Sequence, residues 1–280
     1  MSLLSLFFTS LVLKAEAAND GMSLIERMKP PVDISTNGHL IDGLFYFTTW
    51  LILAYFILVC LGLFGFAYKY WNKKNPKATY LHGTSKKHVA IVAGIGAAVF
   101  ITIDMQITRI ANDDFVGVFA KWPDETKEEV LKVQVLAQQW AWNYRYAGKD
   151  GVFNTEDDVV TLNDLHLPTG KKIVFQVTSK DVIHSFFISN ARQKVDAMPG
   201  RVSRMWVELT KAGKFEIACA EICGTYHYRM ASKLTVHSPE DFKAWMEEAE
   251  LKADQVNDKE DPTRYWGWKW QNAIAAANKN

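Results

Sequence analysis

Two long apolar stretches lie in the first half of the chain. Residues 44–68 are 25 consecutive positions without a charge, rich in Leu, Phe and Ile. At about 1.5 Å per residue, a helix of this length exceeds the roughly 30 Å hydrocarbon core of a bilayer. Residues 89–103 are also apolar, and residues 105–108 extend the run past Asp104. We predict transmembrane helices over 44–68 and 89–108, although a buried globular helix would also fit the second pattern.

The connector between the two stretches, residues 69–88, is basic and contains no Asp or Glu. Its lysines are Lys69, Lys73, Lys74, Lys77, Lys86 and Lys87. A short lysine-rich loop between two membrane spans marks the cytoplasmic side, whereas in a soluble protein it would be a solvated surface loop. We predict an integral, two-pass protein of a bacterial-type cell membrane, with its N-terminus and its C-terminal domain on the extracytoplasmic side.

A shorter apolar run, residues 3–13, stands near the N-terminus and is followed by Lys14 and Ala15-Glu16-Ala17. Eleven helical residues reach only about 16 Å, which is too short to span a bilayer. A short apolar run before a small-x-small pattern is typical of a secretory signal. We predict a signal peptide over 1–17 and an N-terminal extracytoplasmic segment over 18–43.

From about residue 112 the hydrophobic pattern becomes that of short strands. Apolar runs rich in β-branched and aromatic residues occupy 172–178, 202–210, 214–219 and 232–236, with Gly and Pro between them. This pattern predicts an antiparallel sandwich or barrel over 112–238. A helical pattern returns after Pro239 and is followed by a Trp-rich tail. We predict a C-terminal helix and tail over 239–280, and assign the tail no role.

The composition is that of a folded chain, with 280 residues of which 49% are hydrophobic and 22% charged. The net charge is only +1, and we expect no nucleic-acid partner. The three cysteines are Cys60, Cys219 and Cys223. An odd number with one inside an apolar stretch does not predict a disulfide framework. The other two cysteines therefore need their own explanation.

That explanation lies in the residues around them, which read Cys219-Ala220-Glu221-Ile222-Cys223-Gly224-Thr225-Tyr226-His227-Tyr228-Arg229-Met230. A Cys-x3-Cys pair alone is also compatible with structural zinc, a disulfide or a redox pair. Thiolate, imidazole and thioether on one loop favour copper over hard cations. A blue-copper site uses one thiolate and two histidines, so a second cysteine favours two thiolates bridging two copper ions. His184, at the end of another predicted strand, is the candidate second imidazole.

With these residues in place, the chain resembles the cytochrome c oxidase subunit II family. The resemblance rests on the two-helix hairpin, the metal loop, and the runs Gln139-Trp140-Ala141-Trp142-Asn143-Tyr144, Asp181-Val182-Ile183-His184-Ser185 and Lys194-Val195-Asp196-Ala197-Met198-Pro199-Gly200-Arg201. It implies a mixed membrane protein: a transmembrane hairpin followed by an all-β, cupredoxin-like extracytoplasmic domain with a dinuclear copper A centre.

The resemblance also implies roles for single residues. The copper ligands would be His184, Cys219, Cys223, His227, Met230 and the backbone carbonyl of Glu221. The Glu221 carboxylate would help to hold magnesium shared with subunit I. Trp140 would be the aromatic residue through which electrons enter from cytochrome c, although simple strand packing also explains a Trp there. Trp142 and Tyr144 lie in phase with Trp140 on a strand, and either face remains open to them.

The implied function is electron entry into a respiratory terminal oxidase. Cytochrome c would reduce the copper pair, which would pass electrons to haem in subunit I for oxygen reduction coupled to proton pumping. Subunit I and other oxidase subunits are the implied partners. An acidic rim would attract the basic face of cytochrome c. The candidates are Asp150, Glu156, Asp157, Asp158 and Asp196. The acidic run could also bind calcium, but a solvated hairpin loop fits it better.

One position departs from the family pattern. Lys87 stands where the family usually has a Glu associated with proton entry, which puts that route in question. The chain has no Cys-x-x-Cys-His, so no fused c-type haem is expected. Three alternative classes of protein fit the sequence less well. A quinol oxidase subunit typically lacks the copper ligands, and a copper chaperone has its His after the Cys pair, whereas His184 precedes it. Nitrous oxide reductase carries a similar copper loop but is a longer, soluble enzyme that needs no transmembrane hairpin.

Overall fold

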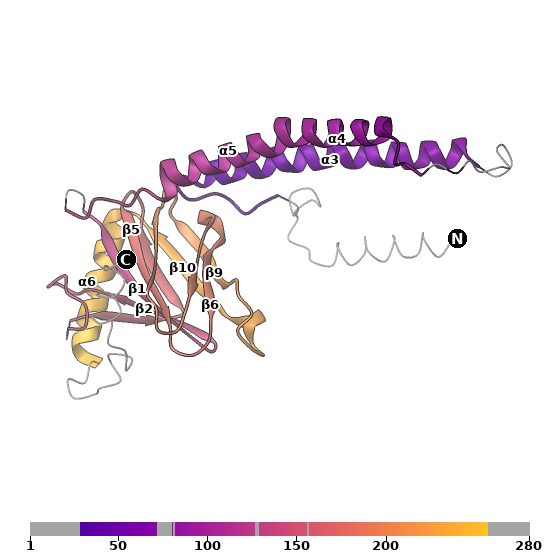
Figure 1. The fold of residues 1–280 in the computed structure, drawn as a ribbon. Helices are drawn as coiled ribbons and strands as arrows, with labels where there is room; N and C mark the ends of the chain where they lie inside the picture. The colour runs from indigo at the N-terminus through magenta and orange to yellow at the C-terminus, as the bar shows by residue number, and fades with distance from the viewer. Residues whose placement is uncertain (1–28, 72–79, 81, 127–128, 156, 257–280) are drawn as a thin grey trace, which may run out of the picture. The chain divides into compact units, whose positions relative to one another are not determined.

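The computed structural model describes residues 29–71, 80, 82–126, 129–155 and 157–256. The predicted signal peptide and the Trp-rich tail lie outside these ranges. Residues 1–33 form one unit, of which only the irregular segment 29–33 is described. Residues from Ile34 onward form the second unit, which contains a helical hairpin and a β-sandwich (Figure 1).

Both predicted membrane helices are present and are long and apolar enough to cross a bilayer. The first is α3, Gly38–Lys69, and the second runs unbroken over Lys86–Phe119. The second helix consists of α4 (Lys86–Val99), η1 (Phe100–Asp104), α5 (Met105–Asp114) and η2 (Phe115–Phe119), the two η segments being π-helical. It lies beside α3 (Figure 1).

The second helix continues beyond its predicted end at Thr108. Its start is fixed by Ser85, whose side-chain oxygen accepts the backbone N–H of His88. Beyond Thr108 the sequence turns polar, but it contains no proline before Phe119, and its one glycine, Gly117, lies within the last five residues of the helix. A change in polarity ends an apolar run without ending a helix, so hydropathy alone misplaces this boundary.

The sandwich consists of two five-stranded sheets. The first has the order β3-β2-β1-β5-β8, and the second has the order β4-β10-β9-β6-β7. The first sheet contains β1 (Leu131–Gln138), β2 (Ala141–Tyr146), β3 (Val159–Leu162), β5 (Lys172–Ser179) and β8 (Ser203–Glu208). The second contains β4 (Asp164–Pro168), β6 (His184–Ile188), β7 (Gln193–Ala197), β9 (Gly213–Cys219) and β10 (Ala231–His237).

The sheets are mixed, which corrects the prediction of a purely antiparallel sandwich. Strand β1 runs parallel to β5, and β10 runs parallel to β4. These pairs arise because the chain crosses between the sheets after β3, β4, β5, β7 and β8, so that sequence neighbours are not always paired. The core between the sheets is apolar. It includes Val133, Val135, Phe175, Phe186 and Ile217. Trp142 and Tyr144 are fully buried, so this side of β2 faces the core.

The predicted C-terminal helix is α6, Pro239–Val256. Ser238 caps it by accepting the backbone N–H of Asp241 at 3.1 Å. Trp245 anchors the helix to the sandwich by stacking on His166, with ring centroids 4.2 Å apart and planes 7° apart. His166 Nδ1 in turn lies 2.8 Å from His237 Nε2. Helix α6 is therefore held by a stack of one indole and two imidazoles.

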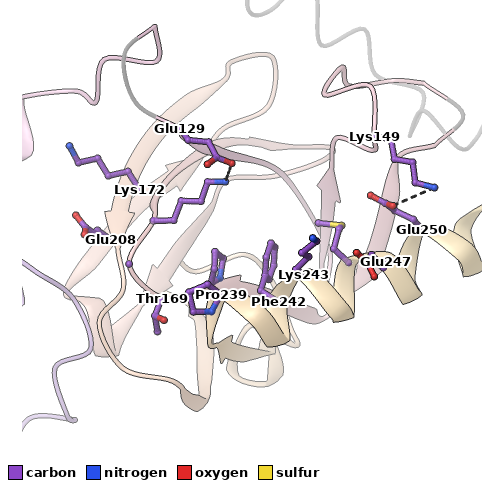
Figure 2. A pocket seen from close by; sticks show the side chains of 14 residues that line it. Glu129, Lys149, Thr169, Lys172, Glu208, Pro239, Phe242, Lys243, Glu247 and Glu250 are labelled. Atoms are coloured by element: carbon purple, nitrogen blue, oxygen red, sulfur yellow. Dashed lines mark hydrogen bonds and ion pairs between the residues drawn. The ribbon is translucent and has the colours of Figure 1, made fainter.

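A groove of about 870 Å³ lies between the N-terminal half of α6 and the turn that precedes β5 (Figure 2). Phe242 and Lys243 of α6 line one side. Ion pairs within this groove join Lys171 to Glu129 and Lys149 to Glu250. None of the predicted metal ligands lines the groove, so the candidate chemistry lies elsewhere.

Candidate metal centre

The predicted ligand loop connects β9 to β10 in the second sheet. Cys219 is the last residue of β9, and Met230 immediately precedes β10. The backbone N–H of Cys219 donates to the carbonyl of Met230 at 3.1 Å, so the strand pairing continues to the first and last predicted side-chain ligands of the loop. His184 begins β6, which pairs with β9 through Phe186 and Cys219. The sheet itself therefore brings His184 next to the loop.

The predicted ligand atoms converge on one place. The Cys219 and Cys223 Sγ atoms are 3.8 Å apart. His184 Nδ1 lies 4.0 Å from Cys219 Sγ, and His227 Nδ1 lies 3.5 Å from Cys223 Sγ. Met230 Sδ is 3.8 Å from Cys223 Sγ, and the Glu221 carbonyl oxygen is 3.2 Å from Cys219 Sγ. All six predicted positions thus lie in one cluster.

These separations fit metal binding. A metal–thiolate bond is about 2.3 Å for zinc, so two sulfurs that share a metal ion lie within about 4.6 Å of each other. The observed sulfur separation of 3.8 Å meets this condition. Ligand atoms of His184, Cys219 and Cys223 all lie within 4.8 Å of one another. The donors are thiolate, imidazole and thioether, which suit a soft metal such as copper.

The cluster is shielded from solvent on most sides. His184 is 0% exposed, Met230 2% and Cys223 3%, while Cys219 is half-buried. Glu221 is the exception, because its residue is exposed although its carbonyl points to Cys219. Its carboxylate is therefore available to a group outside this chain.

The thiols of Cys219 and Cys223 differ strongly in their pKa values. Burial raises the pKa of the Cys219 thiol, but hydrogen bonds from His184 and from backbone groups outweigh burial and lower this pKa to about 6. Burial and the neighbouring Cys219 charge raise the pKa of the Cys223 thiol to about 12. The two thiols therefore differ in how readily they lose a proton, and a metal bound by both sulfurs displaces the proton of Cys223.

Asp181 is a supporting residue that the sequence reasoning missed. Its Oδ1 lies 2.9 Å from His184 Nε2. A hydrogen bond here places the imidazole proton on Nε2 and leaves Nδ1 free toward Cys219, as carboxylates commonly do behind metal-binding histidines. Burial lowers the pKa of His184, but hydrogen bonds to Cys219 and Asp181 raise it overall. The spacing Asp-x-x-His was the available signal.

Trp140 lies between β1 and β2 and is half-buried against the loop. Its Nε1–H donates to the carbonyl of Cys223 at 3.2 Å, and its ring meets Tyr226 edge-on at 4.8 Å. It therefore touches the backbone of a predicted ligand, in contrast to Trp142 two residues later, which packs in the core. Its role in electron entry stays a prediction.

The acidic residues predicted to form a rim are not alike. Asp150 is exposed. Asp158 is only 4% exposed and pairs with buried Arg145 at 3.3 Å, which corrects its assignment to a surface rim. Asp196 accepts a hydrogen bond from Ser185 at 2.8 Å. Glu156 lies outside the described residues. Because Asp158 forms an ion pair inside the domain, the run of acidic residues in the sequence overestimated the number of carboxylates on the surface.

Two apolar helices followed by a β-sandwich with a cluster of soft ligands define the class of membrane-anchored metal-binding subunits. Residues 131–236 match the family model described as cytochrome C oxidase subunit II, periplasmic domain. The alternative cytochrome c oxidase subunit 2 of Bradyrhizobium diazoefficiens is 30% identical over 239 residues, covering 77% of this chain and 82% of that protein. The chain belongs to the cytochrome c oxidase subunit II family.

Two further proteins show the range of the similarity. The cytochrome c oxidase subunit 2 of Thermostichus vulcanus is 30% identical over 200 residues, covering 70% of this chain and 58% of that protein. Among solved structures, the periplasmic domain of subunit II of cytochrome oxidase from Bradyrhizobium japonicum is 29% identical, with a TM-score of 0.40. The matched region covers 45% of this chain and 96% of that structure's chain.

Proposed function

We propose that this chain is the electron-entry subunit of a respiratory terminal oxidase. It accepts electrons from cytochrome c at two copper ions and delivers them to haem in subunit I, where oxygen is reduced to water and protons are pumped. The proposed ligands are His184, Cys219, Cys223, His227, Met230 and the Glu221 carbonyl. The observation that carries the proposal is the convergence of these six groups at separations of 3.2 to 4.0 Å.

The distribution of the ligands supports two metal ions in place of one. Each thiol has its own imidazole, since His184 approaches Cys219 and His227 approaches Cys223. The Glu221 carbonyl lies on the Cys219 side and Met230 on the Cys223 side. Each of the two proposed copper positions thus has one imidazole and one further donor of its own, and the two cysteine sulfurs lie between the positions. Bound copper supplies one-electron redox chemistry.

The chain's own residues perform the remaining tasks. Trp140 connects the surface to the site through its hydrogen bond to the Cys223 carbonyl. Asp181 keeps His184 in the tautomer that offers Nδ1. We propose that the carboxylate of Glu221, an exposed residue, helps to hold magnesium shared with subunit I. Burial of His184 and Met230 limits the access of water to the site.

The membrane topology follows from the charges at the helix ends. Lys69 ends α3, and Lys86 and Lys87 begin α4, so these cations lie where the hairpin turns. We place this end in the cytoplasm and the sandwich and N-terminus outside. Lys87 then stands at the cytoplasmic start of the second span, where we expect proton uptake to differ from that of family members with a Glu.

Copper stoichiometry tests the metal assignment. The full chain in its oxidase complex should hold two copper ions at this site and give a purple mixed-valence spectrum with a seven-line electron paramagnetic resonance pattern. Replacing Cys223→Ser should abolish that signal, whereas Cys60→Ser, in the apolar helix α3, should leave it unchanged. One copper ion with a four-line pattern would contradict the dinuclear assignment.

Electron entry needs a separate test. Trp140→Gln should slow reduction of the copper centre by cytochrome c while the spectrum stays intact. Trp122→Gln is the matched control, because Trp122 is also partly exposed but packs on Arg204 of β8. Equal rates in wild type and Trp140→Gln would return Trp140 to a packing role.

A further inference from the structure

We propose that Gln139 is a positioning residue for electron entry, and that Gly224 provides the space in which it works. In this view Gln139 holds the Trp140 ring and the Cys223 backbone in a fixed relation. The proposal rests on the proposed function, because it assumes that Cys223 binds copper and that electrons pass through Trp140. It adds two residues to which no role has been assigned above.

The side chain of Gln139 is bound directly to the ligand loop. Its Nε2 donates to the carbonyl oxygen of Cys223 at 2.8 Å, and Trp140 Nε1 donates to the same oxygen at 3.2 Å. A carbonyl oxygen has two lone pairs, so both donors can be accepted at once. Two adjacent residues therefore use the whole acceptor capacity of one ligand's carbonyl, which fixes the orientation of that peptide.

The backbone of Gln139 is tied to the other half of the metal cluster. Its N–H donates to Asp181 Oδ2 at 2.7 Å, while Asp181 Oδ1 lies 2.9 Å from His184 Nε2. One residue thus connects the segment that carries His184 with the loop that carries Cys223. A shift of Gln139 would therefore displace both the His184 segment and the Cys223 loop. It would also displace Trp140, the next residue in the chain.

Gly224 makes this approach possible. A Cβ atom at residue 224 would lie 2.8 Å from Gln139 Nε2 and 3.1 Å from Trp140 Cζ2. The backbone φ of Gly224 is also +117°, a conformation that other residues rarely adopt. Any side chain here would push the Gln139 amide off the Cys223 carbonyl. The glycine is required by the close approach of these two side chains as well as by its own backbone.

The functional consequence concerns the path between Trp140 and Cys223. From the Trp140 indole to the Cys223 sulfur the path consists of covalent bonds and one hydrogen bond, Nε1–H to the carbonyl oxygen. Electron tunnelling slows steeply when such a path lengthens or breaks. Gln139 stabilises the carbonyl orientation on which that single hydrogen bond depends, so its removal should reduce electron entry without removing a ligand.

The test uses the assembled oxidase and two substitutions that keep the size of the side chain. Gln139→Met removes the donor, and Gln139→Glu replaces it with a carboxylate that accepts only. Each should lower the rate of copper reduction at saturating cytochrome c by roughly two- to tenfold, the population change that one hydrogen bond can produce. Copper content, the paramagnetic spectrum and the KM for cytochrome c should stay unchanged.

Two comparisons make the result specific. Gln138→Met is the matched control, because within the described part of the chain the Gln138 side chain makes no hydrogen bond, and it should leave the rate unchanged. Gly224→Ala should reproduce the rate loss of the Gln139 variants by displacing the same amide. Dithionite, a small reductant that needs no docking through Trp140, should reduce all variants at the wild-type rate.

The outcomes separate this proposal from the one on which it rests. If Trp140→Gln slows entry but neither Gln139 variant nor Gly224→Ala does, the positioning role is wrong and the proposed function stands. A raised KM with an unchanged limiting rate would assign Gln139 to cytochrome c docking and overturn the proposal. Loss of copper in both Gln139 variants would assign it to folding of the site, which also overturns it.

Discussion

Acidification from about pH 8 to about pH 5 should loosen α6 from the sandwich. The responsible group is His237, whose Nε2 lies 2.8 Å from His166 Nδ1. At this distance one nitrogen must donate and the other accept. His166 Nε2 also lies 3.3 Å from Asp164 Oδ2, and the His166 ring stacks on Trp245. A proton added to His237 Nε2 removes that nitrogen as a hydrogen-bond acceptor.

The free-energy cost of protonating His237 beside a charged His166 can be worked out from the geometry. The ring centroids are 5.1 Å apart, so two imidazolium charges would repel each other by about 3 kcal/mol at an effective dielectric constant of about 20. Loss of the hydrogen bond adds about 1 kcal/mol. Burial and the charge of His166 lower the pKa of His237, against the smaller opposing effects of Asp241 and Asp164.

The sign of the pH dependence follows from this lowered pKa. The folded state prefers neutral His237 more than the unfolded state does, so its contribution to stability is complete above the ordinary histidine pKa of about 6.5. The contribution is lost as the pH falls below that value and through the lowered pKa of the folded state. Stability of the α6 contact should therefore decrease on the acid side of about pH 6.5.

Hydrogen exchange of the α6 amides, measured by mass spectrometry on the full chain in detergent, is a direct assay. After correction for intrinsic exchange rates, protection of 239–256 should fall at about pH 5 while that of β1 and β5 does not. His237→Gln is the control, because an amide can bond to His166 but does not titrate. Unchanged protection at acid pH in the wild type, or the same loss in the variant, would refute the reasoning.

Two other predictions concern carboxylates that pair with buried side chains. Asp158→Ala should lower the free energy of unfolding by about 3–5 kcal/mol, since it leaves the buried guanidinium of Arg145 without its carboxylate; chemical denaturation measures this, and an unchanged midpoint would contradict it. Asp181→Ala should weaken copper binding by about 10- to 100-fold through His184, while Asp181→Asn should lose less. Competition with a chelator of known affinity measures both, and equal affinities would remove Asp181 from the site.

Much of the architecture could be predicted because it depends on local pattern. The charge-free stretch before Lys69 is long enough to specify a membrane helix by itself, and β5 extends only one residue beyond the run predicted from its apolar residues. The parallel pairing of β1 with β5 could not be predicted, because strand order is set by contacts between segments distant in the chain. The extension of the second helix to Phe119 had no hydropathy signal.

The candidate site shows the same division. Cys219, Cys223 and His227 could be proposed as ligands from the sequence because sulfur and imidazole donors are rare and close in sequence. The side chains that support the proposed ligands were not predictable. Asp181 was named only in a run that resembles the family and was given no role, and Gln139 has no unusual chemistry. Their roles depend on a few ångströms of separation between β6, the ligand loop and the β1–β2 turn, which only the folded chain defines.

The hydrogen bond between Cys219 and Met230 has a consequence for the entropy of metal binding. Because the sheet already joins Cys219 and Met230, the first and last proposed side-chain ligands of the loop, a metal ion bound by both would close no additional length of chain between them. The ordering cost is met when the sandwich folds, before any metal arrives. We therefore expect that the whole loop can be replaced by a loop from another family member between β9 and β10. A change in loop length that breaks the pairing of Cys219 with Met230 should not be tolerated.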